Sequence, residues 1–229
     1  MMADLHYAGS AEEEWRLRAA LEEGRARGAE RVVALGDLVC AECSREALRR
    51  LEEVRGIFSA SGMDSLLLPG NHDLDWLSKA DFYAATGRDE SEVRGGFRFS
   101  GTEFVVVDAN FSPGGRAYER GNFVWEEAEL PAKELRRLEG RLREASAPVA
   151  VLSHQNLDAP RLHAVRNATE TFDVLKRSGK VCALFQGHRH LASEEVRAGI
   201  RCVTLGAFRD GAEAEIVEFP MPALPGEPE

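Results

Sequence analysis

Short apolar runs alternate with longer amphipathic segments over much of the chain. Segments with apolar side chains every three or four residues predict helices at 9–28, 44–58, 131–142 and 169–179. Short continuous apolar runs that end in polar residues predict buried strands at 31–37, 65–73, 148–154 and 181–190. This alternation of strand and helix is typical of an α/β domain with a parallel sheet.

Local signals indicate where several helices begin and end. Ser10 and Glu13 have the spacing of a capping box, which predicts the start of the first helix. Pro131 suits the first turn of the third helix, because its missing N–H needs no partner there. Thr169 is the expected cap of the last helix and Gly179 its expected stop.

The middle and the end of the chain predict antiparallel structure. Residues 97–111 contain two β-rich runs on either side of Gly101, Thr102 and Glu103, which predicts a hairpin. Residues 194–219 predict consecutive antiparallel strands. We therefore expect one domain over residues 1–219, in which a parallel sheet is joined by a more antiparallel one. A Pro-rich tail without a packing pattern follows at 220–229.

Composition and charge restrict the partners. The 29 basic and 39 acidic residues give a net charge of −10, which disfavours binding to nucleic acid. No apolar run approaches the roughly 20 residues of a membrane-spanning helix. The N-terminal residues lack the charged leader and apolar core of a signal peptide. We expect a cytoplasmic protein that acts on a small substrate, without membrane contact; the oligomeric state is left open.

Polar side chains gather where the predicted strands end. They are Asp37, then Asn71, His72 and Asp73, then His154, then His188 and His190, with Asp4 and His6 in a similar place near the start. The gap from Asp4 to Asp37 is 37 − 4 = 33 residues, about one strand-and-helix step, so successive ends lie on one side of the sheet. Ligands bind at that edge in open α/β sheets. Five of the six histidines stand at these ends, which favours a metal or catalytic site over isolated structural histidines.

The donor atoms suit two transition-metal ions. Imidazole nitrogens and oxygens, without thiolates, favour Mn, Fe, Zn, Co or Ni. Four imidazoles and three oxygen-bearing residues exceed one ordinary site but fit two ions that share a carboxylate. Two ions about 3.5–4 Å apart commonly hold the phosphoryl oxygens and activate a hydroxide for displacement at phosphorus. We expect two divalent ions, with Mn²⁺ as the first choice.

Five short motifs occur in a fixed order between residues 4 and 190. They are Asp4-Leu5-His6, Gly36-Asp37, Gly70-Asn71-His72-Asp73, Ser153-His154 and Gly187-His188-Arg189-His190. In this order they resemble the calcineurin-like metallophosphoesterase superfamily, and the complete set is highly specific. The resemblance implies a β-sandwich of two mixed sheets flanked by helices, in α-β-β-α layers. It also implies a metal site at the carboxyl ends of the strands.

The resemblance further implies a role for each motif residue. One ion would be bound by Asp4, His6 and His190, the other by Asn71, His154 and His188, and Asp37 would bridge them. His72 would stabilise the transition state and protonate the leaving oxygen, while Asp73 would orient its ring. A carboxylate partner adjusts an imidazole for such proton transfer near neutral pH.

Extended backbone is the expected conformation at the two C-terminal ligands. On such a backbone, residues i and i+2 point to the same side, so His188 and His190 would both face the metals. Gly187 would let the chain turn sharply before them. Between them, Arg189 is a candidate phosphate contact, with a solvent-exposed arginine as the alternative. Tyr7 is a candidate for lining the pocket, with simple packing as the alternative.

The implied activity is hydrolysis of a phosphomonoester, phosphodiester or pyrophosphate bond. A non-catalytic metal-binding scaffold on the same fold is one alternative, but His72 and all seven candidate ligand residues are present. A nuclease is another, and the negative net charge disfavours it. Only three residues precede Asp4, so either the start of the chain lies further upstream or the first strand is shortened. With a shortened strand, we expect a weaker hold on the ion bound by Asp4 and His6. The segment 111–130 is expected to shape specificity.

Overall fold

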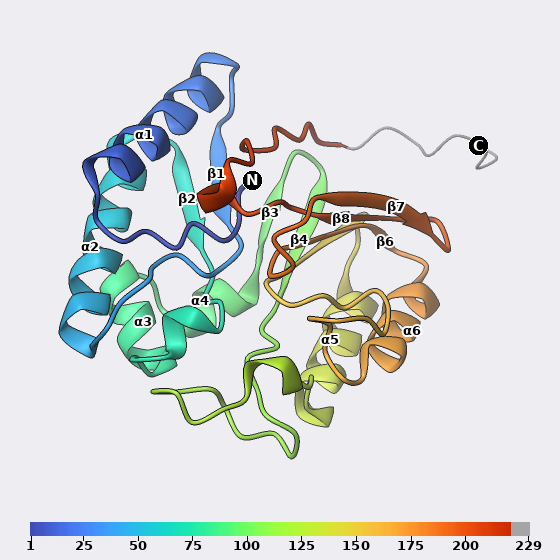
Figure 1. Ribbon diagram of the computed structural model, residues 1–229. Helices are drawn as coiled ribbons and strands as arrows, with labels where there is room; N and C mark the ends of the chain where they lie inside the picture. The colour runs from blue at the N-terminus through green and yellow to red at the C-terminus, as the bar shows by residue number, and fades with distance from the viewer. Residues whose placement is uncertain (221–229) are drawn as a thin grey trace.

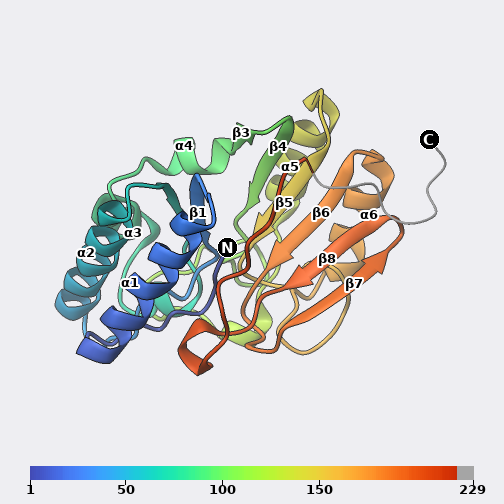
Figure 2. The same cartoon turned by 90° about the horizontal axis from the view of Figure 1, so that it is seen from above.

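The computed structural model describes residues 1–220, and its elements form layers in the expected order of helix, sheet, sheet and helix (Figures 1 and 2). The first helical layer comprises α1 (Ala11–Ala26), α2 (Ser44–Ala60) and α3 (Lys79–Thr86). It lies beside a parallel pair of strands, β1 (Arg31–Ala34) and β2 (Asp64–Leu67). On the opposite side of the molecule, α5 (Ala132–Glu144) and α6 (Ala168–Ser178) cover the larger sheet.

The larger sheet is mixed and has the strand order β3-β4-β5-β6-β8-β7. Its strands are β3 (Phe97–Phe99), β4 (Thr102–Val107), β5 (Val149–Ser153), β6 (Val181–Gln186), β7 (Ser193–Arg197) and β8 (Ile200–Thr204). The inner four strands are parallel, whereas β3 and β7 pair antiparallel at the two edges. Helical crossovers through α5 and α6 make β4, β5 and β6 parallel, whereas the chain reaches β8 from β6 by way of the edge strand β7. The antiparallel edges come from two hairpins.

Alternation of side chains divides the larger sheet between two hydrophobic cores. On β4, Phe104 and Val106 face the core shared with the smaller sheet, while Val105 and Val107 face α5 and α6. Both faces are buried, so the strand sequence is apolar throughout rather than alternating with polar residues. This explains why β4, β5 and β6 are recognisable as continuous apolar runs.

The helix ends agree with the sequence at two positions and differ at a third. Ser10 and Glu13 form the expected capping box of α1, and Gly179 ends α6 with a left-handed backbone. The residue that precedes α6 is Asn167 rather than Thr169, because the helix begins at Ala168. Two short helices, α3 and α4 (Glu90–Gly95), were not expected. No helix among residues 1–220 is both long and apolar enough to span a bilayer.

The first hairpin forms, although its turn comes earlier than expected because Thr102 and Glu103 already belong to β4, and the second antiparallel segment is shorter than expected. Ser100 and Gly101 both have positive φ, which is the two-residue turn that suits the twist of β3 and β4. In the C-terminal part, β7 and β8 pair antiparallel, but no strand follows them within residues 205–220. A single turn, η3 (Phe208–Asp210), and an extended segment take their place. Of the expected tail at 220–229, residues 221–229 lie outside the described residues.

The N-terminal residues join the two sheets without forming a strand of their own. Met2 pairs with Ala34 at the end of β1, and Ala3 pairs with Ala207 beyond β8. The backbone of Met1 also exchanges hydrogen bonds with that of Glu215. The expected shortened first strand is thus a pair of isolated bridges that brings Asp4 between the sheets.

A buried ion pair supports the loops that carry two of the expected ligands. The ammonium of Lys79 on α3 contacts the carboxylate of Asp108 and lies 3.7 Å from the centre of the Phe111 ring. Asp108 also accepts a hydrogen bond from the backbone of Asn110, whose side-chain amide donates to the Pro69 carbonyl at 2.9 Å. Burial by itself would raise the pKa of Asp108, but attraction to Lys79 and the hydrogen bonds from Lys79 and Asn110 together outweigh burial and lower it.

We predict that Lys79→Met lowers the free energy of unfolding by about 3–5 kcal/mol at pH 7, because it leaves Asp108 buried without its cation. The folded-state pKa of Asp108 is depressed, so its stabilising contribution is present at neutral pH and is lost as the pH falls through that pKa. The cost of the substitution should therefore shrink in acid. Urea denaturation of both proteins between pH 3 and pH 7 measures this.

Two controls make this prediction specific. Lys176→Met removes a lysine whose side chain is 55% exposed and should change stability by less than about 0.5 kcal/mol. Adding Asp108→Asn to Lys79→Met should recover most of the loss, since no charge is then buried alone. A cost below about 1 kcal/mol for Lys79→Met would contradict the importance of the pair.

Candidate metal centre

The expected ligand residues come from five separate segments and meet at one edge of the molecule. Four of these segments directly follow β1, β2, β5 and β6, and the fifth is the N-terminal stretch that joins the sheets. The structure brings together Asp4, His6, Asp37, Asn71, His154, His188 and His190. Because parallel strands end at the same edge, loops far apart in sequence deliver their side chains to one place.

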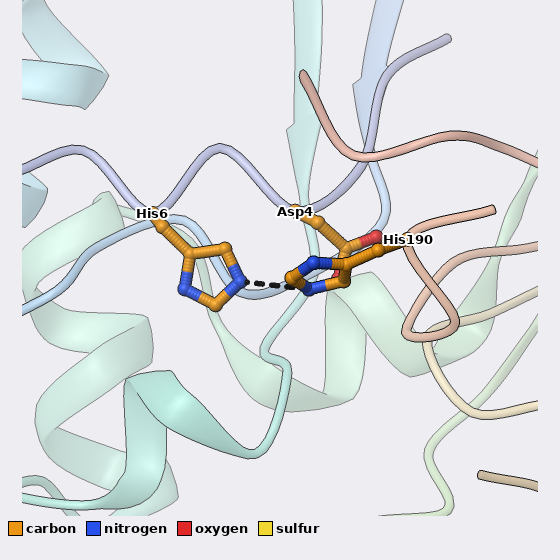
Figure 3. A group of neighbouring side chains, drawn as sticks. All are labelled: Asp4, His6 and His190. Atoms are coloured by element: carbon orange, nitrogen blue, oxygen red, sulfur yellow. Dashed lines mark hydrogen bonds and ion pairs between the residues drawn. The ribbon is translucent and has the colours of Figure 1, made fainter. Parts of the chain in front are cut away.

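Asp4, His6 and His190 form the first group of donors (Figure 3). The Nε2 atoms of His6 and His190 are 3.2 Å apart, and Asp4 Oδ1 lies 3.7 Å from Nε2 of His190. Asp4 is completely buried, and both its oxygens accept from the backbone N–H of His188 at 3.2 and 3.0 Å. The carboxylate of Asp4 is therefore fixed in place by the loop that carries His188 and His190.

The second group contains Asp37, His154 and His188, and Asn71 completes it. Nε2 of His154 lies 3.1 Å from Asn71 Oδ1 and 3.1 Å from Nδ1 of His188. All four side chains are buried. Nδ1 of His154 lies 2.7 Å from the Leu35 carbonyl, which can only accept, so Nδ1 carries a proton and Nε2 is the atom that faces the other donors.

Asp37 lies between the two groups and belongs to both. Its Oδ1 accepts from the backbone N–H of His72 at 2.9 Å. Its Oδ2 is buried and makes no hydrogen bond with any described residue, yet it lies 3.7 Å from His6 Nε2 and 3.4 Å from His154 Nε2. A carboxylate oxygen that faces one nitrogen from each group is suitably placed to bridge two cations.

The protonation of the cluster also fits metal binding. Burial lowers the pKa of His6 to about 4 and that of His188 well below its usual value, so both rings are neutral and offer lone pairs. Burial opposes the charge of His154 as well, but Asp37 raises its pKa to about 9. A divalent ion would neutralise the Asp37 carboxylate more strongly than protonated His154 does, and it would displace the proton from Nε2 of His154. These residues therefore fit a dinuclear centre.

An outer carboxylate orients His190. Nδ1 of His190 lies 3.1 Å from Oδ2 of Asp210 in η3, and this contact directs Nε2 toward Asp4 and His6. Histidines that bind metals commonly donate their other N–H to such a partner. No sequence signal indicated Asp210, because it stands 20 residues beyond His190 in a segment that was expected to be a strand.

Five of the candidate ligands have a left-handed backbone, and this overturns the expected extended conformation. The φ angles are 55° at Asp4, 43° at His6, 51° at Asp37, 68° at His188 and 60° at His190. Residues other than glycine rarely adopt such angles, and they concentrate at functional sites where packing enforces them. His188 and His190 still contribute one ring to each group, as expected, but they do so from a left-handed rather than an extended backbone.

Gly187 serves a different purpose from the expected turn. Its φ is not among the positive values, but a Cβ at this position would lie 2.8 Å from Ala3 Cβ and 2.9 Å from Asp4 Oδ2. Only a residue without a side chain lets β6 end this close to the Asp4 carboxylate. Gly36 is required both for its backbone angle and for its lack of a side chain, since its φ is 93° and a Cβ there would lie 2.7 Å from His154 Nδ1.

His72 lies at the rim of the cluster, and its carboxylate partner is Asp75 rather than Asp73. The ring centres of His72 and His6 are 5.2 Å apart, and the His72 side chain is 43% exposed. Its Nδ1 lies 2.8 Å from Asp75 Oδ2, and chiefly this hydrogen bond raises the pKa of His72 to about 9. Asp73 instead accepts from the backbone N–H groups of Leu38, Val39 and Gly70, so it ties two loops together.

The two candidate substrate contacts differ in their surroundings. Tyr7 is buried in the core shared by the sheets, and its backbone pairs with Val39, so packing explains it. Arg189 is half-buried, and its guanidinium has no hydrogen-bond or ion-pair partner within residues 1–220. His163 was expected to lie elsewhere, but its ring centre is 5.2 Å from that of His188.

We predict that Asp37→Ala weakens the binding of both ions, because one carboxylate faces both groups. Loss of an outer partner already costs about 10–100-fold in metal affinity, so loss of this side chain should cost more than about 100-fold at each site. Calorimetric titration of the metal-stripped protein with Mn²⁺ measures it. Asp4→Ala, by contrast, should weaken one ion more than the other. Two tightly bound ions in Asp37→Ala would refute the shared position.

Comparison with solved structures finds the same fold in proteins of low sequence identity. A dimetal phosphatase from Danio rerio superimposes with a TM-score of 0.73 at 18% identity, over 90% of this chain and 85% of that one. A protein from Thermus thermophilus superimposes with a TM-score of 0.62 at 14% sequence identity, over 92% of this chain and 89% of that one. Plasmodium GAP50, described as the anchor in the inner membrane complex, superimposes with a TM-score of 0.63 at 12% sequence identity, over 90% of this chain and 70% of that one. At these identities the likeness concerns the fold alone.

The family comparison extends to the motifs themselves. No curated protein matches the chain in sequence. The model of the calcineurin-like phosphoesterase family matches residues 1–192, a range that contains every candidate ligand and His72. The chain therefore belongs to the calcineurin-like phosphoesterase family.

Proposed function

We propose that the protein is a metal-dependent phosphoesterase that hydrolyses a phosphomonoester, phosphodiester or pyrophosphate bond. The observation that carries this proposal is the buried Oδ2 of Asp37, which has no hydrogen-bond donor among residues 1–220 and faces one histidine nitrogen from each group. Such an atom needs cations on both sides. Two adjacent cations are the usual means of displacing a group at phosphorus.

The proposed assignment gives each ion three ligands and one shared ligand. Asp4, His6 and His190 would hold one ion, Asn71, His154 and His188 the other, and Asp37 both. Oxygen and imidazole donors are compatible with Mn, Fe, Zn, Co or Ni, of which we propose Mn²⁺. When bound, the two ions supply positive charge to the phosphoryl oxygens and lower the pKa of water so that a nucleophile exists at neutral pH.

His72 is the proposed proton donor to the leaving oxygen. It lies beside the first group, is accessible from solvent, and is not one of the ligands. With a pKa of about 9, its ring is protonated at neutral pH and can both donate a proton and stabilise negative charge. Asp75 holds Nδ1, which leaves Nε2 as the atom that donates. Asp73 would act indirectly, by fixing the loop from which His72 projects.

Other functions are less well supported. A non-catalytic scaffold is conceivable on this fold, and GAP50 is described as an anchor, but a scaffold has no need for His72 at the rim of a complete donor set. A nuclease would require favourable contacts with many phosphates, which a net charge of −10 opposes. We further propose that residues 1–219 form one domain, since Phe219 packs against Phe104 and Phe185 in the shared core.

Hydrolysis of bis-p-nitrophenyl phosphate and p-nitrophenyl phosphate tests the proposed activity. Metal-stripped protein should be inactive, and added Mn²⁺ should restore turnover of at least one compound. The ratio of the two rates separates diester from monoester preference. Absence of turnover with Mn, Fe, Zn, Co and Ni would reject the hydrolase and favour the scaffold.

We predict that His72→Ala lowers kcat by about 10²–10⁴-fold on alkyl esters, which need a protonated leaving oxygen, and by less on p-nitrophenyl esters. Asp75→Asn should lower kcat in the same substrate-dependent way but more weakly. Both variants should bind Mn²⁺ like the unmodified protein. Asp73→Asn is the matched comparison and should reduce stability, because Asp73 accepts three backbone N–H groups. Equal losses on both classes of ester would argue against proton donation by His72.

A further inference from the structure

We propose that Trp125 and His163 form a binding subsite for a planar aromatic ring of the substrate, and that the substrate class is therefore phosphate esters that carry a nucleobase. The inference rests on the proposed function, because it assumes that the phosphate binds at the metal centre. It concerns residues outside the five motifs. It is carried by the position, the exposure and the surroundings of this aromatic pair.

The pair stands directly against the metal centre. Trp125 belongs to η2 (Trp125–Glu127), and His163 belongs to the loop before α6. Their rings are stacked, with centres 5.0 Å apart and planes 11° from parallel. Both rings lie edge-on to the ring of His188, and the distance between ring centres is 5.6 Å for Trp125 and 5.2 Å for His163. A ligand whose phosphate reaches His188 therefore has an aromatic surface within the length of a nucleotide.

Core packing does not account for Trp125. It is half-buried and does not belong to either hydrophobic core, whereas its neighbour Phe123 packs against the outer one. The apolar residues next to the pair are open to solvent, since Val124 is 55% exposed and Leu162 is 72% exposed. Exposed apolar side chains grouped beside a polar centre are a feature of ligand sites.

Charge separates the two ends of the proposed ligand. Arg189 lies between two metal-centre histidines and has no anionic partner within residues 1–220, so it suits a phosphate group. Near the pair, Glu126 and Glu127 follow Trp125, and Glu127 is 3.7 Å from Arg166. These carboxylates disfavour a second anion at the aromatic end. A neutral planar ring, such as a nucleobase, can stack there on the indole of Trp125, which His163 supports from its other face.

A purely structural role would have different consequences. If the stacked pair only supported His188, its removal would weaken Mn²⁺ and every phosphate ligand alike. If the pair binds a ring, its removal would affect only ligands that carry one. The two roles are therefore distinguished by a pair of ligands that share a phosphate and differ in the base.

Adenosine 5′-monophosphate and ribose 5-phosphate are such a pair. Both would be titrated calorimetrically into Mn²⁺-loaded protein in the His72→Ala background, which limits turnover during the measurement. We expect the nucleotide to bind about 5–100-fold more tightly, as stacking of one base on an aromatic side chain implies. Trp125→Ala should abolish this difference and leave the affinity for ribose 5-phosphate and for Mn²⁺ unchanged.

Two further variants serve as controls. Trp125→Phe keeps an aromatic face and should retain most of the preference. Trp15→Ala removes another tryptophan, 69% exposed on α1, and should change neither affinity. Equal affinity of the His72→Ala protein with Trp125 intact for the two ligands would by itself overturn the proposal. Loss of Mn²⁺ affinity in Trp125→Ala would also overturn it, in favour of structural support for His188.

This experiment separates the subsite from the proposed hydrolysis. A preference for the nucleotide that depends on Trp125 would support the subsite even if no phosphate ester were hydrolysed. In that case only the proposed hydrolase activity would be rejected. Turnover of p-nitrophenyl esters combined with equal affinity for the two ligands would have the opposite meaning, since the enzyme would stand and the nucleobase subsite would fall.

Discussion

The Oδ2 atom of Asp37 is buried between two groups of donors, where it accepts no hydrogen bond from any described residue and faces the Nε2 atoms of His6 and His154. In a protein interior this placement of a carboxylate oxygen is unfavourable unless positive charge lies beside it. Much of the surrounding structure keeps it in place. The N–H of His72 holds the other oxygen, the Leu35 carbonyl fixes His154, and Asp210 fixes His190. Left-handed backbone at five ligands adds strain of about 1–3 kcal/mol for each such residue.

Packing of the two sheets supplies the stability that this arrangement requires. The shared core joins α1, α2 and the smaller sheet to one face of the larger sheet, and α5 and α6 bury the other face. Buried polar contacts then couple this scaffold to the ligand loops. Asp73 connects the loops after β1 and β2, and Asn110 joins Pro69 to Gln155, the neighbour of His154. Thus the chemistry lies on loops, but these loops are held by groups as buried as the core.

The sequence was sufficient for the features that depend on period, spacing and motif. The apolar runs located β1, β2, β5 and β6, and the strand ends identified all seven residues that the structure gathers. The sequence was insufficient where a contact depends on the direction in which a side chain points. Asp73 and Asp75 are both close to His72 in sequence, but Asp73 points toward backbone amides and Asp75 toward the ring. Asp210, Trp125 and His163 reach the centre through tertiary structure alone. The left-handed angles at His188 and His190 were likewise hidden, since such angles are uncommon for any residue other than glycine, even though Asn, Asp and His adopt them more often than most.

The bridges at Met2 and Ala3 link the metal centre to the architecture in a further way. Met2 pairs with the smaller sheet and Ala3 with the segment beyond the larger one, and Asp4 follows at once. Asp4 and Asp37 therefore keep their separation only while the two sheets keep theirs. Binding of ions and closure of the sandwich are thermodynamically linked, so each stabilises the other. The Met2–Ala34 and Ala3–Ala207 bridges would in this way couple the contact between the two sheets to the affinity of the proposed centre.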